Sequence, residues 1–310
     1  MKVVTMNLKG IQASSLDLHM HSNASTDGQY SPEELVQVVR RHGVKIMALS
    51  DHDTVRNVKE TIQCAREIGL EVIPAGEFTC DWQEYELHVL GYGIDYSDPR
   101  FEELKCELEE CEREVAKKRI VTIKNLGIVF DEAAVWKTAV NGVYAPERIA
   151  MLALAEPANR DHPLLQPFLP GGDRSDNPAL NFAWDFCELG GPAYIPTRHN
   201  SISFVTGLIH DTGGVAVLAH PGCYFGENTG PMEALLGQSD FDGVEVYSSY
   251  HDLKSTAIFH ELTERLQLLE TVGSDFHGQT KPNLTPGCVS CEGREAELLE
   301  KLSKVMVSAV

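Results

Sequence analysis

Apolar runs rich in β-branched residues recur along the chain, and most of them alternate with helical patterns. One helical pattern begins at Ser31-Pro32, where a serine N-cap, a proline and two following glutamates form a start signal, and it stops near Gly43. Strands alternating with helices predict a parallel sheet. The expected strands are residues 16–19, 46–49, 70–74, 87–90, 215–219, 244–247 and 268–272, and the expected helices are residues 35–41, 57–68, 202–211 and 253–266.

The segment from Pro99 to about Gly191 departs from this alternation. It begins with a long, highly charged helical pattern over residues 101–126, and a stretch rich in proline, glycine and aspartate follows. Most charges of the long helix are expected on a solvated face. We therefore predict a helical insertion, residues 99–192, between the fourth and fifth strands, with residues 1–98 and 193–310 forming the two parts of the main domain.

Composition narrows the range of functions. The 310 residues are 43% hydrophobic and 23% charged, which suits one large domain carrying an insertion. The formal net charge of −20 argues against a long nucleic acid or an anionic membrane as a partner. Neither a secretory signal pattern in residues 1–15 nor an apolar run of about 18 residues is evident, so a cytoplasmic protein with reduced cysteines is expected. The Cys288 and Cys291 pair lacks the second pair that a structural zinc site needs.

Histidines and carboxylates gather where the predicted strands end. In parallel α/β barrels the carboxyl ends of the strands converge on one rim, where active sites are built. One histidine at a strand end is usually a partly buried structural residue, but six of the twelve beside several acids predict a metal site. The histidines are His19, His21, His52, His88, His220 and His277, and the acids are Asp27, Asp51, Asp53, Glu77 and Asp275.

Spacing refines this expectation. His19 and His21 stand two residues apart in a strand, so their side chains point the same way and both can reach one ion. Glu77 offers a carboxylate that could bridge two ions. Because the ligands are so numerous, a cluster of two or three divalent ions is a better match than one. Imidazole and carboxylate together suit zinc, manganese or iron.

Seven segments resemble, in order, the motifs of the PHP (polymerase and histidinol phosphatase) family of amidohydrolase-like metal enzymes: DLHMHSNASTDG, ALSDHDT, GEF, ELHVLGY, LAHPG, GVEVY and GSDFHG. The resemblance spans residues 16–93 and 194–290. It implies an α/β fold, a distorted (β/α)7 barrel, and phosphate ester hydrolysis at three divalent ions, with manganese expected and zinc or iron as alternatives. By the same resemblance, one ion is held by His19, His21, Glu77 and Asp275, a second by Glu77, His88 and His220, and a third by Asp27, His52 and His277.

Such a site is expected to use metal-bound hydroxide against phosphorus, since the ions lower the pKa of bound water. The leaving alkoxide needs a proton, and His251, soon after the sixth strand, is the candidate donor, with a surface histidine at a helix start as the alternative. In similar proteins the insertion covers the metal site and acts as a substrate cap. Arg148 is the first candidate for a remote phosphate, although it is displaced from the Arg-Pro-His-type motif of relatives. Lys117 and Arg119 on the long helix come next.

Three function classes remain open. The first is a phosphoesterase for a small phosphorylated ribose or nucleotide; the preferred substrate is 5-phosphoribosyl 1,2-cyclic phosphate, and the alternative is a 3′,5′-nucleotide bisphosphate. The second class is a 5′-3′ exonuclease acting on short RNA. The third is a non-catalytic metal-binding module, against which the complete ligand set argues. The prediction is therefore an enzyme for a small phosphorylated substrate, and the sequence leaves its oligomeric state open.

Overall fold

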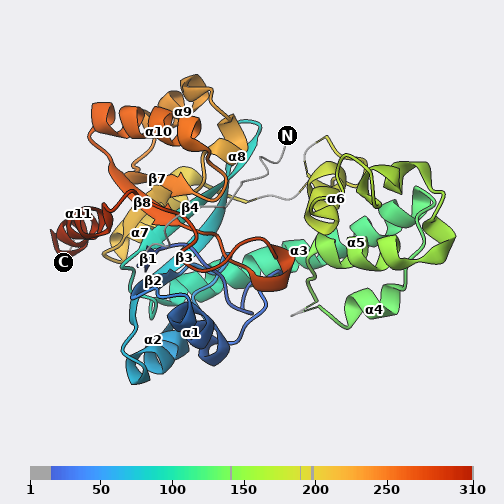
Figure 1. The fold of residues 1–310 in the computed structure, drawn as a ribbon, viewed down its shortest axis with the longest axis horizontal. Coiled ribbons are helices and arrows are strands. Elements are labelled where there is room, and N and C mark those ends of the chain that lie inside the picture. The colour runs from blue at the N-terminus through green and yellow to red at the C-terminus, as the bar shows by residue number, and fades with distance from the viewer. Residues whose placement is uncertain (1–14, 140–141, 189, 197–198, 309–310) are drawn as a thin grey trace.

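The computed structural model describes residues 15–308 except 140–141, 189 and 197–198. Its strands form one sheet that curls into a nearly closed barrel (Figure 1). Closure occurs where Leu18 N donates to Val272 O at 2.9 Å and Met20 forms a bridge with Phe276, so the barrel prediction is confirmed. Around the barrel the strands are β1 (Leu16–Asp17), β2 (Ile46–Leu49), β3 (Glu71–Trp82), β4 (Tyr85–Tyr92), β6 (Val215–Leu218), β7 (Gly243–Ser248) and β8 (Leu269–Gly273), while β5 (Asn200–Ser201) pairs with β3.

The expectation of a parallel sheet was wrong at one strand. β4 runs antiparallel to both β3 and β6. Two residues separate β3 from β4, and Gln83 in this turn has a φ of 53°. A parallel neighbour needs a crossover of a dozen or more residues, whereas two residues suffice for a hairpin. The reversal brings Glu77 on β3 and His88 on β4 to the same end of the barrel.

Helices cover the outside of the barrel (Figure 1). The first begins as predicted, because the Ser31 side chain accepts from Glu34 N at 3.4 Å and Glu34 Oε2 accepts from Ser31 N at 3.0 Å. The described residues contain no helix that is long and apolar enough to cross a membrane. The covering helices are α1 (Pro32–Arg41), α2 (Val58–Glu67), α7 (Ile202–Asp211), α8 (Gly222–Phe225), α9 (Thr229–Leu236), α10 (Leu253–Leu266) and α11 (Glu295–Ser308).

Between β4 and β5 the chain leaves the barrel and forms a smaller helical body to one side of it (Figure 1). The helix α3 (Pro99–Asn125) belongs to both parts: Phe101 and Leu104 pack in the barrel core, whereas Ile120 and Ile123 pack in a second core. The long helix therefore joins two hydrophobic cores. The smaller body contains α3 (Pro99–Asn125), α4 (Glu132–Trp136), α5 (Pro146–Ala155), the 3-10 turns Pro157–Asn159 and Pro163–Phe168, and α6 (Pro178–Cys187).

Candidate metal centre

Four candidate ligand atoms converge just beyond the ends of β1 and β8. His19 Nε2 lies 3.1 Å from Glu77 Oε2 and 3.4 Å from Asp275 Oδ1. His21 Nε2 lies 3.2 Å and 3.1 Å from the same two oxygens. All four residues are almost fully buried, and one atom from each lies within 4.8 Å of the others. This grouping matches the first predicted ligand set.

The converging atoms lack hydrogen-bond partners, which is unusual for buried polar groups. His19 Nε2, His21 Nε2, Glu77 Oε2 and Asp275 Oδ1 are all buried without one, despite their short mutual distances. Leaving such atoms unsatisfied costs free energy, and a shared divalent cation would satisfy all four at once. The donor set therefore fits a metal ion.

Glu77 extends the cluster towards β4 and β6. Its Oε1 lies 2.8 Å from His88 Nδ1 and 2.9 Å from His220 Nε2. Because its other oxygen faces His19 and His21, the carboxylate stands between two groups of histidines. The predicted bridging position of Glu77 is consistent with this geometry.

Asp27, His52 and His277 form the third corner. Asp27 Oδ2 lies 3.1 Å from His277 Nε2 and 3.7 Å from His52 Nε2. The two imidazole nitrogens are 3.4 Å apart, and His277 Nδ1 is 2.9 Å from Asp275 O, which it reaches as a donor. That bond leaves His277 Nε2 free to act as a ligand. The nine residues predicted to bind metal are thus brought together in one place.

Two ligand candidates have backbone conformations that residues other than glycine rarely adopt. His220 has a φ of 25° and Asp275 a φ of 55°. Positive φ angles cost free energy for residues with a Cβ, so the surroundings must hold them. Asp275 N donates to His19 O at 2.8 Å, and His220 N donates to Glu245 Oε2 at 2.9 Å. Strain of this kind is concentrated at functional sites.

Electrostatics at the cluster favour a cation. Burial opposes ionisation of Glu77, yet His19 and the other histidines around it hold the pKa of its carboxyl group well below its usual range. Burial also opposes protonation of His19, but Glu77, Glu245 and Asp275 raise the pKa of its imidazole well above the usual value. In both cases nearby positive charge stabilises the buried carboxylates, and bound metal ions would supply this charge in place of protons.

Three residues have a supporting role that the sequence did not assign to them. Glu245 Oε1 lies 2.9 Å from His19 Nδ1, and the buried Val-Glu-Val alternation of β7 was the available signal for this acid. Tyr250 donates to Asp275 Oδ2 at 2.7 Å, and Lys281 forms an ion pair with the same oxygen. Together they occupy Oδ2 and leave Asp275 Oδ1 facing the histidines. Behind a metal centre, such partners orient ligands and fix imidazole tautomers.

Asp51 supports the cluster through a serine. It accepts from Ser25 Oγ at 2.9 Å and from Ser22 N at 2.7 Å. Since the Ser25 hydroxyl donates to Asp51, its oxygen accepts from His21 Nδ1 at 3.1 Å. This chain leaves His21 Nε2 with a lone pair towards the cluster. Asp51, one of the acids that the sequence places at a strand end, therefore orients His21 through Ser25.

His251 occupies surroundings unlike those expected of a proton donor. It is 3% exposed, its Nδ1 donates to Val246 O at 2.9 Å, and its Nε2 accepts from Gly222 N at 2.9 Å. Burial lowers the pKa of the imidazole to about 4, which favours the neutral form at pH 7. Both ring nitrogens are therefore engaged in joining β7 to α8. Its role as the acid stays a prediction that its contacts do not support.

The predicted substrate residues of the insertion lie in different environments. Lys117 is exposed and pairs with Glu114 at 2.7 Å, and Arg148 Nη1 lies 4.0 Å from Met151 Sδ within its own helix. Arg119 is different, because its Nε is buried without a hydrogen-bond partner. Of these three, Arg119 has the surroundings best suited to an incoming anion.

Two other insertion residues reach the barrel. Trp184 on α6 lies with its ring centroid 6.4 Å from that of Tyr250. Glu147 is buried, burial and the charge of Asp27 raise the pKa of its carboxyl group to about 7, and Lys281 partly offsets this. The register of α6 explains the position of Trp184, because Phe182 and Phe186, four residues apart, face the insertion core and residue 184 points the opposite way. The insertion thus borders the metal centre.

A barrel with convergent histidines and carboxylates is typical of metal-dependent hydrolases, and similarity to known proteins identifies the family. Residues 17–133 match the model of the PHP domain. The chain is 30% identical over 266 residues to a 5′-3′ exoribonuclease of Haemophilus influenzae, covering 84% of this chain and 89% of that protein. It is 27% identical over 270 residues to a 3′,5′-nucleoside bisphosphate phosphatase of Chromobacterium violaceum, covering 85% and 87%.

More distant matches agree with this assignment. A phosphoribosyl 1,2-cyclic phosphate 1,2-diphosphodiesterase of Eggerthella lenta is 24% identical over 267 residues, covering 85% of this chain and 94% of that protein. The solved structure of an amidohydrolase from Chromobacterium violaceum superposes with a TM-score of 0.77 at 23% identity, covering 93% and 97%. The protein is a metal-dependent phosphoesterase. It belongs to the PHP family, as its motifs indicated.

Proposed function

We propose that this protein hydrolyses phosphate esters of nucleotides, taking phosphate from 3′,5′-nucleoside bisphosphates and mononucleotides from the 5′ ends of short RNA, with three divalent metal ions, most suitably manganese. The observation that carries the proposal is the set of nine candidate ligands around Glu77. The relatives of highest identity named above act on nucleotides or RNA.

Bound divalent ions would supply Lewis acidity towards phosphoryl oxygens and a nucleophilic water at neutral pH. The residues around the cluster orient the ligands and add charge beside them. Glu245 and Ser25 set the tautomers of His19 and His21, so that both present Nε2 to the cluster. Tyr250 and Lys281 hold one oxygen of Asp275, and the Lys281 ammonium adds positive charge beside the cluster. We also propose Arg119 as a substrate contact from the insertion.

The test is a phosphate-release screen with metal analysis. Purified protein loaded with manganese should release phosphate from adenosine 3′,5′-bisphosphate and mononucleotides from a short 5′-phosphorylated RNA. About three ions per chain are expected by mass spectrometry of the metals. A His220→Ala variant should lose both activities. Fewer than two metals per chain, or no release from any phosphate ester, would overturn the proposal.

A second candidate is a cyclic phosphodiesterase acting on 5-phosphoribosyl 1,2-cyclic phosphate, followed by removal of the resulting monoester. The Eggerthella lenta relative favours it. Assaying this ester beside adenosine 3′,5′-bisphosphate separates the two candidates. A kcat/KM higher by about tenfold, or about 1.4 kcal/mol, for the cyclic ester would favour the second.

Two further proposals concern the setting in which the enzyme works. We propose a cytoplasmic location, supported by the fact that all eight cysteines are free. The net charge of −20 supports small substrates over long nucleic acids. Fractionation with a tagged chain and a length series of RNA substrates test these two points.

A further inference from the structure

The loop that follows β8 returns to the metal cluster and brings a lysine with it. Lys281 comes four residues after the candidate ligand His277, and its N–H group donates to Gly278 O at 3.1 Å. The neighbouring Thr280 donates through Oγ1 to Asp27 O at 2.6 Å, which fastens this loop to the one that carries Asp27. These bonds fix the backbone from which the Lys281 side chain extends.

The ammonium group of Lys281 lies one carboxylate away from the cluster. Its Nζ forms an ion pair with Asp275 Oδ2. The other oxygen of the same carboxylate lies 3.4 Å from His19 Nε2 and 3.1 Å from His21 Nε2. Nζ also lies over the ring of Tyr250, 5.3 Å from its centroid. These contacts place the ammonium beside the first candidate ion site.

Most of the hydrogen-bonding capacity of this ammonium is unused. A lysine ammonium carries three N–H donors, and within the described part of the chain Lys281 makes one hydrogen bond with them, to Asp275. The side chain is nevertheless only 11% exposed. Lysine is rarely buried without partners, because desolvating an ammonium group is costly. The remaining N–H groups are therefore available to a ligand that accepts hydrogen bonds.

The charge balance around Lys281 changes when metal ions bind. In the structure its ammonium neutralises Asp275, whose carboxylate is the one within 4.0 Å of it among the described residues. The ligand carboxylates of Asp27, Glu77 and Asp275 carry three negative charges, whereas the three proposed divalent ions would carry six positive ones. Asp275 is then neutralised by the ions, and the ammonium adds to an excess of positive charge that suits an anion.

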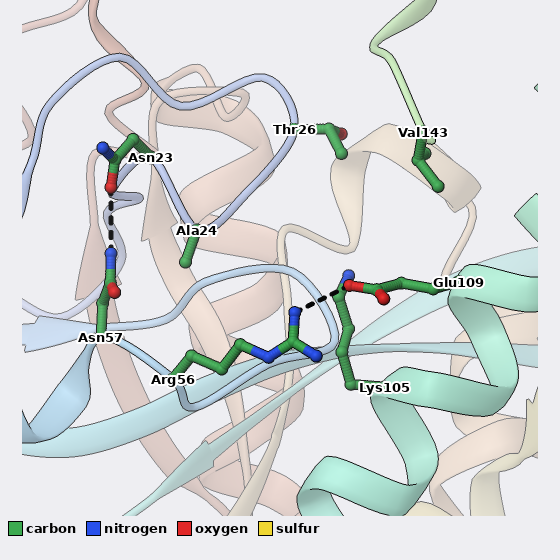
Figure 2. A pocket seen from close by; sticks show the side chains of 8 residues that line it. All are labelled: Asn23, Ala24, Thr26, Arg56, Asn57, Lys105, Glu109 and Val143. Carbon is green, nitrogen blue, oxygen red and sulfur yellow. Dashed lines mark hydrogen bonds and ion pairs between the residues drawn. The ribbon is translucent and has the colours of Figure 1, made fainter. Parts of the chain in front are cut away.

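The helical insertion covers this corner of the rim. Val143, on the segment that leads into α5, lines a pocket together with Thr26, the neighbour of Asp27 (Figure 2). Glu147, in the first turn of α5, is buried, and its carboxyl group is close enough to feel the charge of Lys281. A group bound to the ammonium would therefore lie between the cluster and the insertion, where a covered substrate belongs.

We propose that Lys281 is a catalytic residue whose ammonium donates hydrogen bonds to a non-bridging oxygen of the phosphoryl group that is hydrolysed. A fixed positive charge at this oxygen stabilises the negative charge of the phosphoryl group while water adds to phosphorus and the ester bond breaks. Lys281 keeps its proton, so it takes no part in proton transfer. This inference rests on the metal ions of the proposed function but not on its nucleotide substrates, because every phosphate ester presents such oxygens.

The test separates contact with phosphate from support of Asp275. Lys281→Met and Tyr250→Phe each remove one hydrogen bond to Asp275 Oδ2, so the two variants are matched in their effect on this ligand. Binding of inorganic phosphate is measured by calorimetry on protein saturated with manganese. Lys281→Met should keep its metal and bind phosphate about tenfold or more weakly, as expected for a lost charge-assisted hydrogen bond. Tyr250→Phe, once loaded, should bind phosphate as the wild type does.

Two further variants complete the comparison. Lys281→Arg keeps the positive charge and the donors, so it should restore most of the phosphate affinity. Lys254→Met removes the same charge from an exposed lysine that pairs with Glu227, and it should change neither metal content nor phosphate affinity. If Lys281→Met is unfolded by circular dichroism, Lys281→Gln is measured in its place with the same expectation.

Two results would overturn the proposal: phosphate affinity in Lys281→Met equal to that of the wild type, or an equal weakening in Lys281→Met and Tyr250→Phe. Either would leave Lys281 as a positioning residue for Asp275. A wild type that binds phosphate through Lys281 but hydrolyses no nucleotide would instead contradict the proposed function and leave this inference standing.

Discussion

Charged side chains have opposite surroundings at the rim of the barrel and in the helical insertion. At the rim, carboxylates and imidazoles are buried and several of their atoms have no partner. In the insertion, charged side chains mostly form exposed pairs, such as Lys117 with Glu114 and Lys124 with Glu132. None of the described insertion residues joins the ligand groups around Glu77. We infer that the rim carries the metal chemistry, whereas the insertion affects which substrate reaches it.

The largest expected effect tests the rim directly. Glu77→Gln removes the carboxylate that contacts histidines on both sides of the cluster. Activity should fall by more than about 100-fold, which is the largest loss expected for a residue that only supports a metal ligand. The metal content should drop as well. Glu71→Gln, at the exposed start of the same strand, is the control. Full metal occupancy in Glu77→Gln would contradict its bridging position.

Glu245→Gln should have the next largest effect. The buried carboxylate fixes the His19 ring and the His220 backbone without belonging to the predicted ligands. We expect metal affinity or kcat to fall by about 10–100-fold with the fold intact. Chelator titration followed by circular dichroism measures both. An unfolded Glu245→Gln protein, or unchanged metal affinity, would show that this glutamate acts differently.

A third prediction concerns pH. The pKa of His251 is lowered to about 4 from 6.5, so the unfolded chain binds a proton between these values that the folded chain does not. The contribution of His251 to the free energy of unfolding is constant above pH 6.5 and is lost as the pH falls below that value. About 2 kcal/mol should be lost by pH 5. Urea unfolding of the wild type and His251→Gln, at pH 7 and pH 5, measures the difference.

The same variant tests the predicted acid role of His251. If the residue mainly joins β7 to α8, activity of folded His251→Gln at pH 7 should remain within about tenfold of the wild type. A loss of about 100-fold or more, with unchanged stability and metal content, would restore His251 as a proton donor.

The smallest expected effect tests the insertion. Trp184→Ala removes the ring that approaches Tyr250, and an aromatic pair of this kind is worth about 0.5–1.5 kcal/mol. We expect KM to rise by about 2–10-fold while metal content stays unchanged. Trp184→Phe should retain most of the affinity. If Trp184→Ala lowers metal content as strongly as Glu245→Gln, the division between rim and insertion is wrong.

Much of the barrel could be predicted because its signals are local. Buried strands such as 46–49 read as short apolar runs, and the spacing of His19 and His21 already places both side chains on one face. The reversal of β4 was missed because a strand's direction depends on its turn, and Gln83-Glu84 is not a typical hairpin sequence.

The contacts between distant segments could not be predicted in the same way. Tyr250 and Lys281 meet at Asp275 only because two loops after different strands fold over one corner of the rim. Arg119 has a buried Nε atom without a hydrogen-bond partner because of how the insertion helices pack, which its local sequence does not specify.

The position of Glu77 has a consequence for how the enzyme acquires its metals. This single carboxylate contacts five histidines, namely His19, His21, His52, His88 and His220. Ions that share one ligand cannot occupy their sites independently, since the first to bind orients the carboxylate for the next. We expect loading to be cooperative. When metal is scarce, a population of this protein should then contain filled and empty molecules with few in between.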